Sequence, residues 1–203
     1  MVTYFDFANS LPIVIIASVS LLIMIVEAIF PKKDKSEPVT FLLCIAALAA
    51  AMTFSFFDIN KNLILYNNFL RFNTLTSVLN LTLLLGILIT VISSRNYLYQ
   101  EGIHVSEYYL LLMFSLLGMM LMINANDLLI LFVGLELMSV CFYVLAGFIR
   151  NRLDSNESAI KYFLLGAFLT GFLLLGIAFI FGYTGSTNYS EIAKANPVKD
   201  TFY

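Results

Sequence analysis

Hydrophobic residues are grouped along this chain into six long runs, which short polar segments separate. The runs lie at 11–30, 39–58, 69–94, 106–123, 127–149 and 157–183. Each run has the roughly 18 or more residues that an α-helix needs to cross the hydrocarbon core of a bilayer. The pattern therefore predicts an all-α fold, a polytopic membrane helix bundle with about six transmembrane helices of a larger fold.

Composition strengthens this prediction. Of the 203 residues, 61% are hydrophobic and only 12% are charged, whereas a soluble domain carries about 25% charged residues. The first ten residues contain Asp6 but no Lys or Arg. Because a secretory signal peptide begins with a basic segment, we interpret the first run as a retained helix.

The runs divide the chain into three segments. Residues 1–105 hold the first three helices, residues 106–183 hold helices four to six, and residues 184–203 form a tail. The odd-numbered loops carry six Lys and Arg residues, and the even-numbered loops carry two. When the tail is counted with the even-numbered loops, the comparison is six against four. Positively charged loops stay on the cytoplasmic side, so the sequence places the N-terminus and the tail outside.

Prolines and capping residues mark the expected helix ends. Pro31 is predicted to end the first helix and Pro38 to begin the second, because proline cannot donate a backbone hydrogen bond. The short link between the fifth and sixth helices predicts antiparallel neighbours. The caps of these two helices are predicted at Asn126 or Asp127 and at Asp154 or Ser155.

The residue types that usually hold cofactors are sparse. Cys44 and Cys141 both fall inside predicted helices, which favours apolar packing over a disulfide or a metal site. His104 is the only histidine, and it lies in a loop. We therefore expect no metal and no cofactor on this chain.

Glu27 and Glu136 are acidic residues inside the apolar runs. Glu27 lies four residues before Pro31, where its side chain can reach the interface. Glu136 lies deeper, about 13–14 Å from one end of its helix and about 20 Å from the other, at 1.5 Å per residue. An ionised acid near the bilayer centre costs roughly 2.5–3.5 kcal/mol. Such a cost favours a proton or ion site at Glu136, with a structural, hydrogen-bonded glutamate as the alternative.

A polar stripe extends from Glu136 along its helix. Ser139, Tyr143, Gly147 and Arg150 all fall within about 60° of Glu136 on a helical wheel. The stripe leads from the buried acid toward the basic loop.

Lys161 lies early in the sixth helix. Its expected axial distance from Glu136 is about 13–14 Å, which is too long for a direct salt bridge. A lysine in a low-dielectric site has a lowered pKa and suits reversible protonation. A lysine whose head group reaches the interface is the alternative reading.

Three motifs in the second half of the chain resemble a known family. They are "ELMS" in the fifth run, "ESAIKYFLLGAF" at the start of the sixth, and "GYTGST" after it. Together they resemble subunit N of bacterial respiratory complex I, the counterpart of mitochondrial NADH dehydrogenase chain 2. The first four runs fit this family by position and hydropathy.

The resemblance implies a part of an antiporter-like subunit of fourteen helices with two inverted five-helix repeats. It implies that Glu136 and Lys161 act in proton translocation, driven by electron transfer from NADH to quinone elsewhere in the complex. It also implies other membrane subunits as partners and no cofactor bound by this chain. The family's seventh helix, with a lysine that pairs with the glutamate, and its second repeat would lie on the rest of a longer chain or on another chain.

Location and alternatives follow from the same resemblance. It implies a multi-pass protein of the bacterial inner membrane, or of the mitochondrial inner membrane. Mrp-type cation/proton antiporters share the glutamate, so an antiporter module is an alternative function. A purely structural membrane subunit is another.

Overall fold

The computed structural model describes residues 4–29, 33–100 and 105–195. Six of its helices are long and apolar enough to cross a membrane, which confirms the predicted all-α membrane bundle. These helices are α2 (Leu11–Ile29), α3 (Lys33–Phe57), α4 (Thr74–Gln100), α5 (Val105–Asn124), α6 (Leu128–Ala146) and α7 (Leu153–Thr184). The short elements are α1 (Tyr4–Asn9), β1 (Leu63–Leu65), β2 (Leu70–Phe72) and α8 (Tyr189–Ile192).

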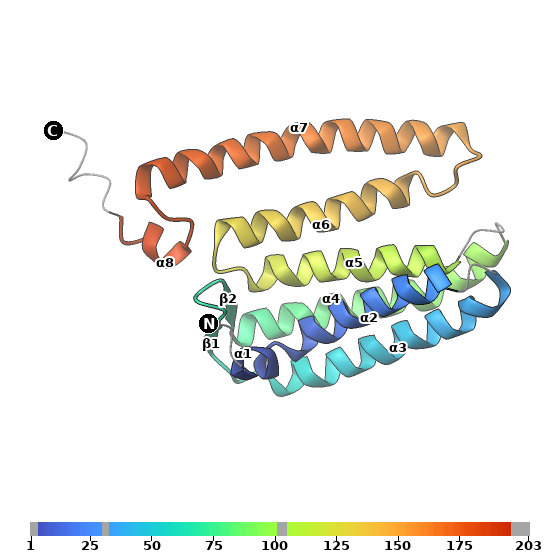
Figure 1. The fold of residues 1–203 in the computed structure, drawn as a ribbon, viewed down its shortest axis with the longest axis horizontal. Helices are drawn as coiled ribbons and strands as arrows, with labels where there is room; N and C mark the ends of the chain where they lie inside the picture. Colours follow the sequence, from blue (N-terminus) through green and yellow to red (C-terminus); the bar gives the residue numbers. More distant parts are fainter. Residues whose placement is uncertain (1–3, 30–32, 101–104, 196–203) are drawn as a thin grey trace.

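The long helices lie side by side, and the four short elements gather at one end of the bundle (Figure 1). Helix α5 is central, because it contacts α2, α3, α4 and α6. Helix α7 contacts α6 and the short α8, and it lies on the outside of the bundle (Figure 1). The predicted antiparallel pairing of the fifth and sixth transmembrane helices is thereby confirmed.

The core is built around one face of α5. Tyr109, Met113, Leu116 and Met120 follow one another at spacings of three and four residues, and each is fully buried. This spacing places four side chains on one stripe of a helix. The stripe is therefore the surface on which the neighbouring helices pack.

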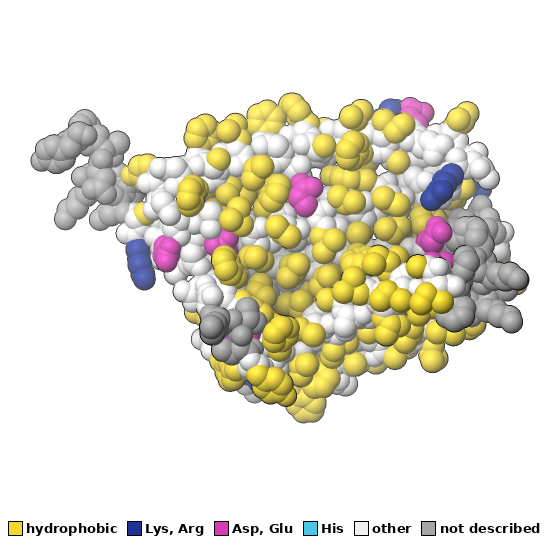
Figure 2. Space-filling model, viewed as in Figure 1, with side chains coloured by type: hydrophobic (Ala, Val, Ile, Leu, Met, Phe, Trp, Pro, Cys, Tyr) yellow, Lys and Arg dark blue, Asp and Glu magenta, His cyan; other side chains and the backbone are white. Residues whose placement is uncertain are grey.

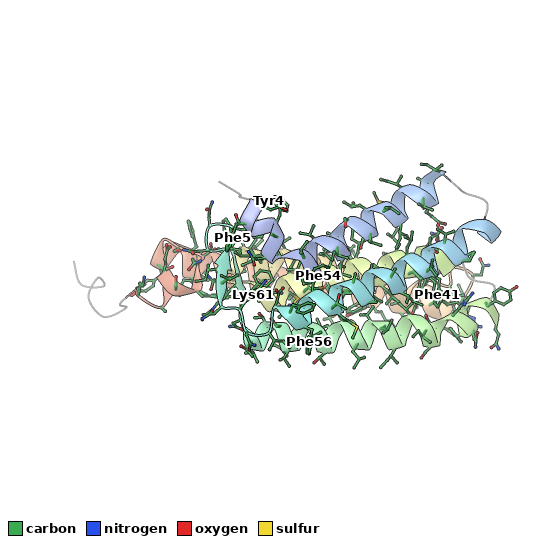
Figure 3. The ribbon with its side chains drawn as sticks, turned by 90° about the horizontal axis from the view of Figure 1, so that it is seen from below. Tyr4, Phe5, Phe41, Phe54, Phe56 and Lys61 are labelled. Atoms are coloured by element: carbon green, nitrogen blue, oxygen red, sulfur yellow. The ribbon has the colours of Figure 1, made fainter. Side chains whose placement is uncertain are left out.

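The outer surface is apolar, as a lipid-facing surface must be. Hydrophobic side chains cover much of the face seen in Figure 2, and the Lys and Arg side chains visible there lie toward its two ends. Exposed aromatic side chains gather near Lys61 at the end that carries the short elements, among them Tyr4, Phe5, Phe54 and Phe56 (Figure 3). Aromatic residues at such a level are typical of a membrane interface.

A β-hairpin replaces the expected start of the third transmembrane helix at residue 69. Strands β1 and β2 pair antiparallel, and Tyr66, Asn67 and Asn68 turn between them with φ of 54°, 53° and 71°. Helix α4 then begins at Thr74. The side chain of Asn73 accepts a hydrogen bond from the Thr76 backbone at 2.8 Å, so this asparagine caps the helix.

Two further expectations about helix starts are wrong. Helix α3 begins at Lys33, so Pro38 lies inside it, although the stretch apolar enough to cross the membrane does begin at Pro38. Helix α7 begins at Leu153, and neither Asp154 nor Ser155 caps it. Ser155 instead donates a hydrogen bond to the Ala146 carbonyl at 3.0 Å and ties α7 to the end of α6.

Two residues named above lie outside the described part of the chain. They are Pro31, expected to end the first helix, and His104, the only histidine. Helix α2 ends at Ile29.

Candidate functional site

Asp127 fixes where α6 begins. Its carboxylate accepts a hydrogen bond from the Leu129 backbone at 2.8 Å, which confirms one of the two predicted caps. The second carboxylate oxygen accepts a hydrogen bond from the Thr187 hydroxyl at 2.7 Å. The start of α6 is therefore tied to the segment that follows α7.

Two glycines let α5 and α6 cross at backbone contact. A Cβ added at Gly118 would lie 2.6 Å from the Gly134 carbonyl oxygen, and one added at Gly134 would lie 2.8 Å from the Gly118 carbonyl oxygen. Small residues allow such close approach between membrane helices. Because Glu136 follows Gly134 by two residues, this crossing sets its position relative to α5.

Glu136 lies near the middle of α6. It comes eight residues after Leu128 and ten before Ala146, so it is about 12 Å from one end of the helix and about 15 Å from the other. The side chain is half-buried. Its Oε1 atom is buried and has no hydrogen-bond partner among the residues that the structure describes.

An unpaired carboxyl oxygen at this depth has a clear chemical consequence. A buried carboxylate without a partner is costly. A water or a polar neighbour would satisfy the oxygen.

Two positions of the predicted polar stripe, Ser139 and Tyr143, are buried, whereas Gly147 and the exposed Arg150 lie beyond the end of α6 at Ala146. Ser139 and Tyr143 are each 8% exposed. The Tyr143 ring meets Tyr162 and Phe163 of α7 edge-on, with ring centroids 4.8 and 5.7 Å apart. Its hydroxyl lies over Gly166, where a Cβ would approach to 1.9 Å. Tyr143 thus joins the stripe to α7.

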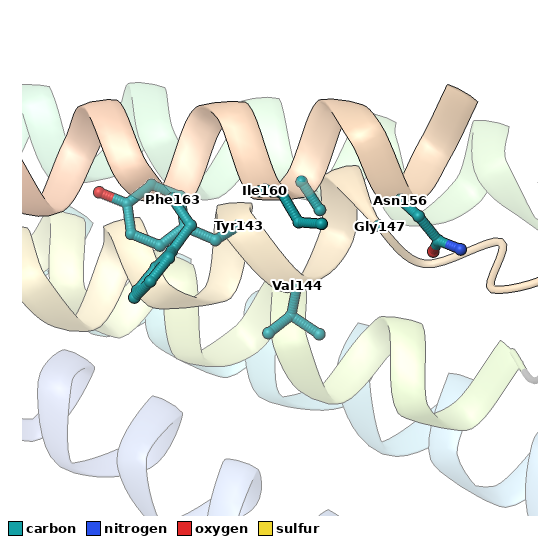
Figure 4. Close-up of a pocket in the computed structure, with 7 residues that line it drawn as sticks. Tyr143, Val144, Gly147, Asn156, Ile160 and Phe163 are labelled. Atoms are coloured by element: carbon teal, nitrogen blue, oxygen red, sulfur yellow. The ribbon is translucent and has the colours of Figure 1, made fainter. Parts of the chain in front are cut away.

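A groove runs between α6 and α7 beside Tyr143 (Figure 4). Its volume is about 570 Å³, and Val144, Gly147, Ile160 and Phe163 line it together with the polar Asn156. A Cβ at Gly147 would lie 2.7 Å from the Ala159 Cβ, so the helices touch closely there as well.

Lys161 and Glu136 do not meet. The Lys161 side chain is 73% exposed and forms an ion pair with Glu157, one turn earlier on α7. The Gly147 and Ala159 Cβ positions touch, so they lie at one level. Glu136 is eleven residues from that level and Lys161 is two residues from it on the same side, which leaves about 13–14 Å along the axis. The prediction that no direct salt bridge joins the two groups is confirmed, and the separation agrees with the expected distance.

Lys161 lies near a membrane boundary. It precedes the end of α7 at Thr184 by 23 residues, or about 34 Å, whereas the hydrocarbon core is about 30 Å thick. Lys161 can therefore be a lysine at the membrane interface or a proton-transfer group, and both interpretations remain. Glu27 is half-buried two residues before the end of α2, as expected for a side chain near an interface.

Several buried polar side chains carry no motif and were missed by sequence reasoning. Asn80 of α4 and Asn124 of α5 are 3% and 0% exposed, and the Oδ1 atom of each has no hydrogen-bond partner within the described ranges. Ser55 of α3 is 2% exposed. Asn80 and Ser55 could have been marked only by their occurrence within apolar runs, and Asn124 only by its place directly after one.

Metal chemistry finds no support in the part of the chain that the structure describes. No group of three or more His, Cys, Asp or Glu side chains there could hold a metal ion. Cys44 and Cys141 are buried and unpaired with one another, in keeping with the packing role predicted for them.

Comparison with known proteins first defines the class. Residues 125–202, which include Glu136, match the family model of the NADH:quinone oxidoreductase/Mrp antiporter transmembrane region. The structure is similar to that of a chain of respiratory complex I from Thermus thermophilus, with a TM-score of 0.74 and 29% identity, over 87% of this chain and 38% of that one. The fold thus matches part of an antiporter-like membrane subunit.

The particular subunit follows from curated relatives. The chain is 39% identical to NADH-quinone oxidoreductase subunit N 2 of Roseiflexus castenholzii over 85% of its own length and 34% of that protein. It is 40% identical to subunit N 1 of Chloroherpeton thalassium over 93% of its own length and 39% of that protein. The chain is a homologue of NADH-quinone oxidoreductase subunit N, and it spans between a third and two fifths of the length of these relatives.

Proposed function

We propose that this chain is part of a proton-translocating membrane subunit of an NADH:quinone oxidoreductase. The observation that carries the proposal is the buried carboxyl oxygen of Glu136, which has no partner in the described residues and lies in the middle of a transmembrane helix. Homology to subunit N supports the same reading.

In this proposal Glu136 is the proton-binding group. The neutral carboxyl is the cheaper form at that depth, and a change in its surroundings that favours the carboxylate releases the proton. Ser139 and Tyr143 extend from Glu136 toward α7 and offer hydroxyl groups that accept and donate hydrogen bonds. Lys161 is the second proton-transfer group at the membrane boundary, and water or a third group links it to Glu136 across the axial gap.

The driving reaction takes place elsewhere in the complex. Electron transfer from NADH to quinone supplies the energy, and this chain contributes no redox group of its own. Its partners are the other membrane subunits of the complex, and the remaining helices of the subunit lie on the rest of a longer chain or on another chain. The location is the bacterial inner membrane, in line with the bacterial homologues, and the mitochondrial inner membrane is the alternative.

Glu136→Gln tests the proposal, because glutamine keeps the shape and the hydrogen-bonding capacity of the side chain but does not ionise. Proton uptake driven by NADH should fall by at least about tenfold in membranes that contain the assembled variant, a loss of roughly 1.4 kcal/mol or more. Glu107→Gln is the matched control, since Glu107 lies in the first turn of α5, and its pumping should stay near the wild-type rate. Unchanged pumping and assembly in Glu136→Gln would favour a purely structural role.

A cation/proton antiporter module outside any redox complex is the second candidate. The matched family model covers both kinds of protein. Purification of the native assembly through a tag on this chain separates them. Dehydrogenase subunits among the partners support the oxidoreductase, and antiporter subunits without redox partners support the exchanger.

A further inference from the structure

A polar cavity lies at the end of the bundle that carries the short elements. It has a volume of about 350 Å³, within the range of roughly 300–1,000 Å³ that is typical of small-molecule sites. Strand β2, the start of α4, the link between α5 and α6, and α8 all contribute to it. Its polar lining consists of Arg71, Asn73, Thr76, Asn126, Tyr189 and Ser190.

Hydrogen bonds hold the walls of this cavity in place. The Asn126 backbone donates to the Phe69 carbonyl at 2.9 Å, and its side-chain amide donates to the Asn68 carbonyl at 2.8 Å. Asn188 donates to the same Asn68 carbonyl at 3.0 Å. The hairpin turn, the α5–α6 link and the segment after α7 thus form one connected frame, and a ligand would meet a preorganised site.

Arg71 is the one charged side chain among the described residues that line the cavity. No ion pair joins Arg71 to a carboxylate in the described ranges. The acids of the adjoining segments, Asp127 and Glu191, do not line the cavity, and each accepts a hydrogen bond from a hydroxyl of Thr187 or Ser186. The positive end of the α4 dipole points to the same place, because the cavity is lined by the residues that begin this helix.

Tyr189 and Arg71 supply the hydrogen-bond donors that a ligand would meet in the cavity. Burial and the negative charge of Asp127 raise the pKa of the Tyr189 hydroxyl above its ordinary value, so this hydroxyl stays protonated and able to donate. The Ser190 hydroxyl already donates to the Asn188 side chain at 2.7 Å, whereas the Arg71 guanidinium presents several N–H groups in one plane. This set matches the planar, bidentate recognition of a phosphate.

The level of the cavity in the membrane favours a lipid. Helix α4 begins at Thr74 and α5 ends at Asn124, so the cavity lies where the transmembrane helices end and phospholipid head groups begin. We propose that this cavity binds the phosphate of an anionic phospholipid head group through Arg71. Inorganic phosphate has the same chemistry and is the other source of the ligand. The inference does not depend on the proposed proton-translocating function.

Lipid binding to the delipidated native assembly tests this proposal. Native mass spectrometry would count bound phosphatidylglycerol and, for comparison, phosphatidylcholine with the same acyl chains. Arg71→Gln should weaken phosphatidylglycerol binding about tenfold, as expected for the loss of a charge-assisted hydrogen bond. Lys194→Gln is the matched control, because this exposed lysine near the same end does not line the cavity, and it should bind as the wild type does.

Further measurements separate lipid binding from free-phosphate binding and from a protein contact of Arg71. If inorganic phosphate displaces the bound lipid and binds in an Arg71-dependent way, the site is an anion site that free phosphate also fills. If Arg71→Gln does not assemble, Arg71→Lys keeps the charge and should bind with intermediate affinity. Equal lipid and phosphate affinities in the wild type and in the variants would overturn the proposal. Loss of a neighbouring subunit with unchanged lipid content would overturn it too, and would assign Arg71 to a protein contact.

Discussion

The glycine contact between α5 and α6 can be tested with a single methyl group. A Cβ added at Gly118 would lie 2.6 Å from the Gly134 carbonyl oxygen and 2.7 Å from the Met138 backbone nitrogen. Both atoms belong to the backbone of α6, so no side chain can rotate away. Ordinary contact needs about 3.4 Å or more, so Gly118→Ala must move the helices apart by about 0.8 Å.

The expected cost follows from this displacement. Overpacking of a well-packed interface costs about 1–3 kcal/mol. For an unfolding unit of about 150–250 residues each kcal/mol lowers Tm by about 2–4 °C, and the shift is smaller in a larger assembly. Thermal unfolding of the purified assembly should therefore show a clear loss for Gly118→Ala. A second substitution, Gly134→Ala, should add less than its own separate cost, because both methyl groups would separate the same two helices.

The control is a glycine with open space around it. A Cβ at Gly171 would have no neighbour within 4 Å, and alanine has the better helix propensity. Gly171→Ala should therefore leave Tm unchanged or raise it slightly. If Gly118→Ala unfolds at the same temperature as Gly171→Ala, the close crossing of α5 and α6 is not a feature of the protein.

Three further predictions follow from single contacts. Gly166→Ala should displace the Tyr143 ring from α7, and a 3-fluorotyrosine at position 143 should then show a changed chemical shift. The loss of Tm should be smaller than for Gly118→Ala, because the Tyr143 side chain can move aside whereas the backbone of α6 cannot. Asp127→Asn should lower the Tyr189 pKa toward its ordinary value, measured by fluorine NMR during a pH titration, since it removes one of the two causes that raise it. Cys44 is fully buried, so a maleimide should label it only after denaturation, and rapid labelling of the folded assembly would contradict the packing of α3.

The sequence predicts the membrane bundle well, because a transmembrane helix is defined by a long apolar run. All six runs correspond to long helices. The Asp127 cap was also predictable, since an acidic residue directly before an apolar run satisfies free N–H groups in the first turn. These features depend on residues that are close in sequence.

Features that depend on tertiary contacts were not predictable in the same way. Strand β2 of the hairpin occupies residues that the sequence predicted to begin a helix at residue 69. The turn of the hairpin depends on Asn67 and Asn68 at positive φ. The hairpin is also stabilised from a distance, because the Asn68 carbonyl accepts hydrogen bonds from Asn126 and Asn188. Such partners cannot be recognised from one sequence.

The site itself was partly predictable. The depth of Glu136 and the stripe through Ser139 and Tyr143 followed from helical geometry alone. The axial distance to Lys161 followed from the same geometry. The contact of Tyr143 with Gly166 did not, because a large and a small residue on two separate runs give no sign that they will meet.

The same residues therefore hold α7 in place and form the polar stripe. Tyr143 contacts Tyr162, Phe163 and Gly166, whereas Ile177 is the one buried residue among the described residues of α7 itself. A change at Tyr143 should thus alter both the packing of α7 and the surroundings of Glu136. Tyr143→Phe separates the two effects, because it keeps the ring contacts and removes only the hydroxyl. If proton uptake falls while Tm holds, the hydroxyl belongs to the proton path. If both hold, the stripe beyond Ser139 serves packing alone.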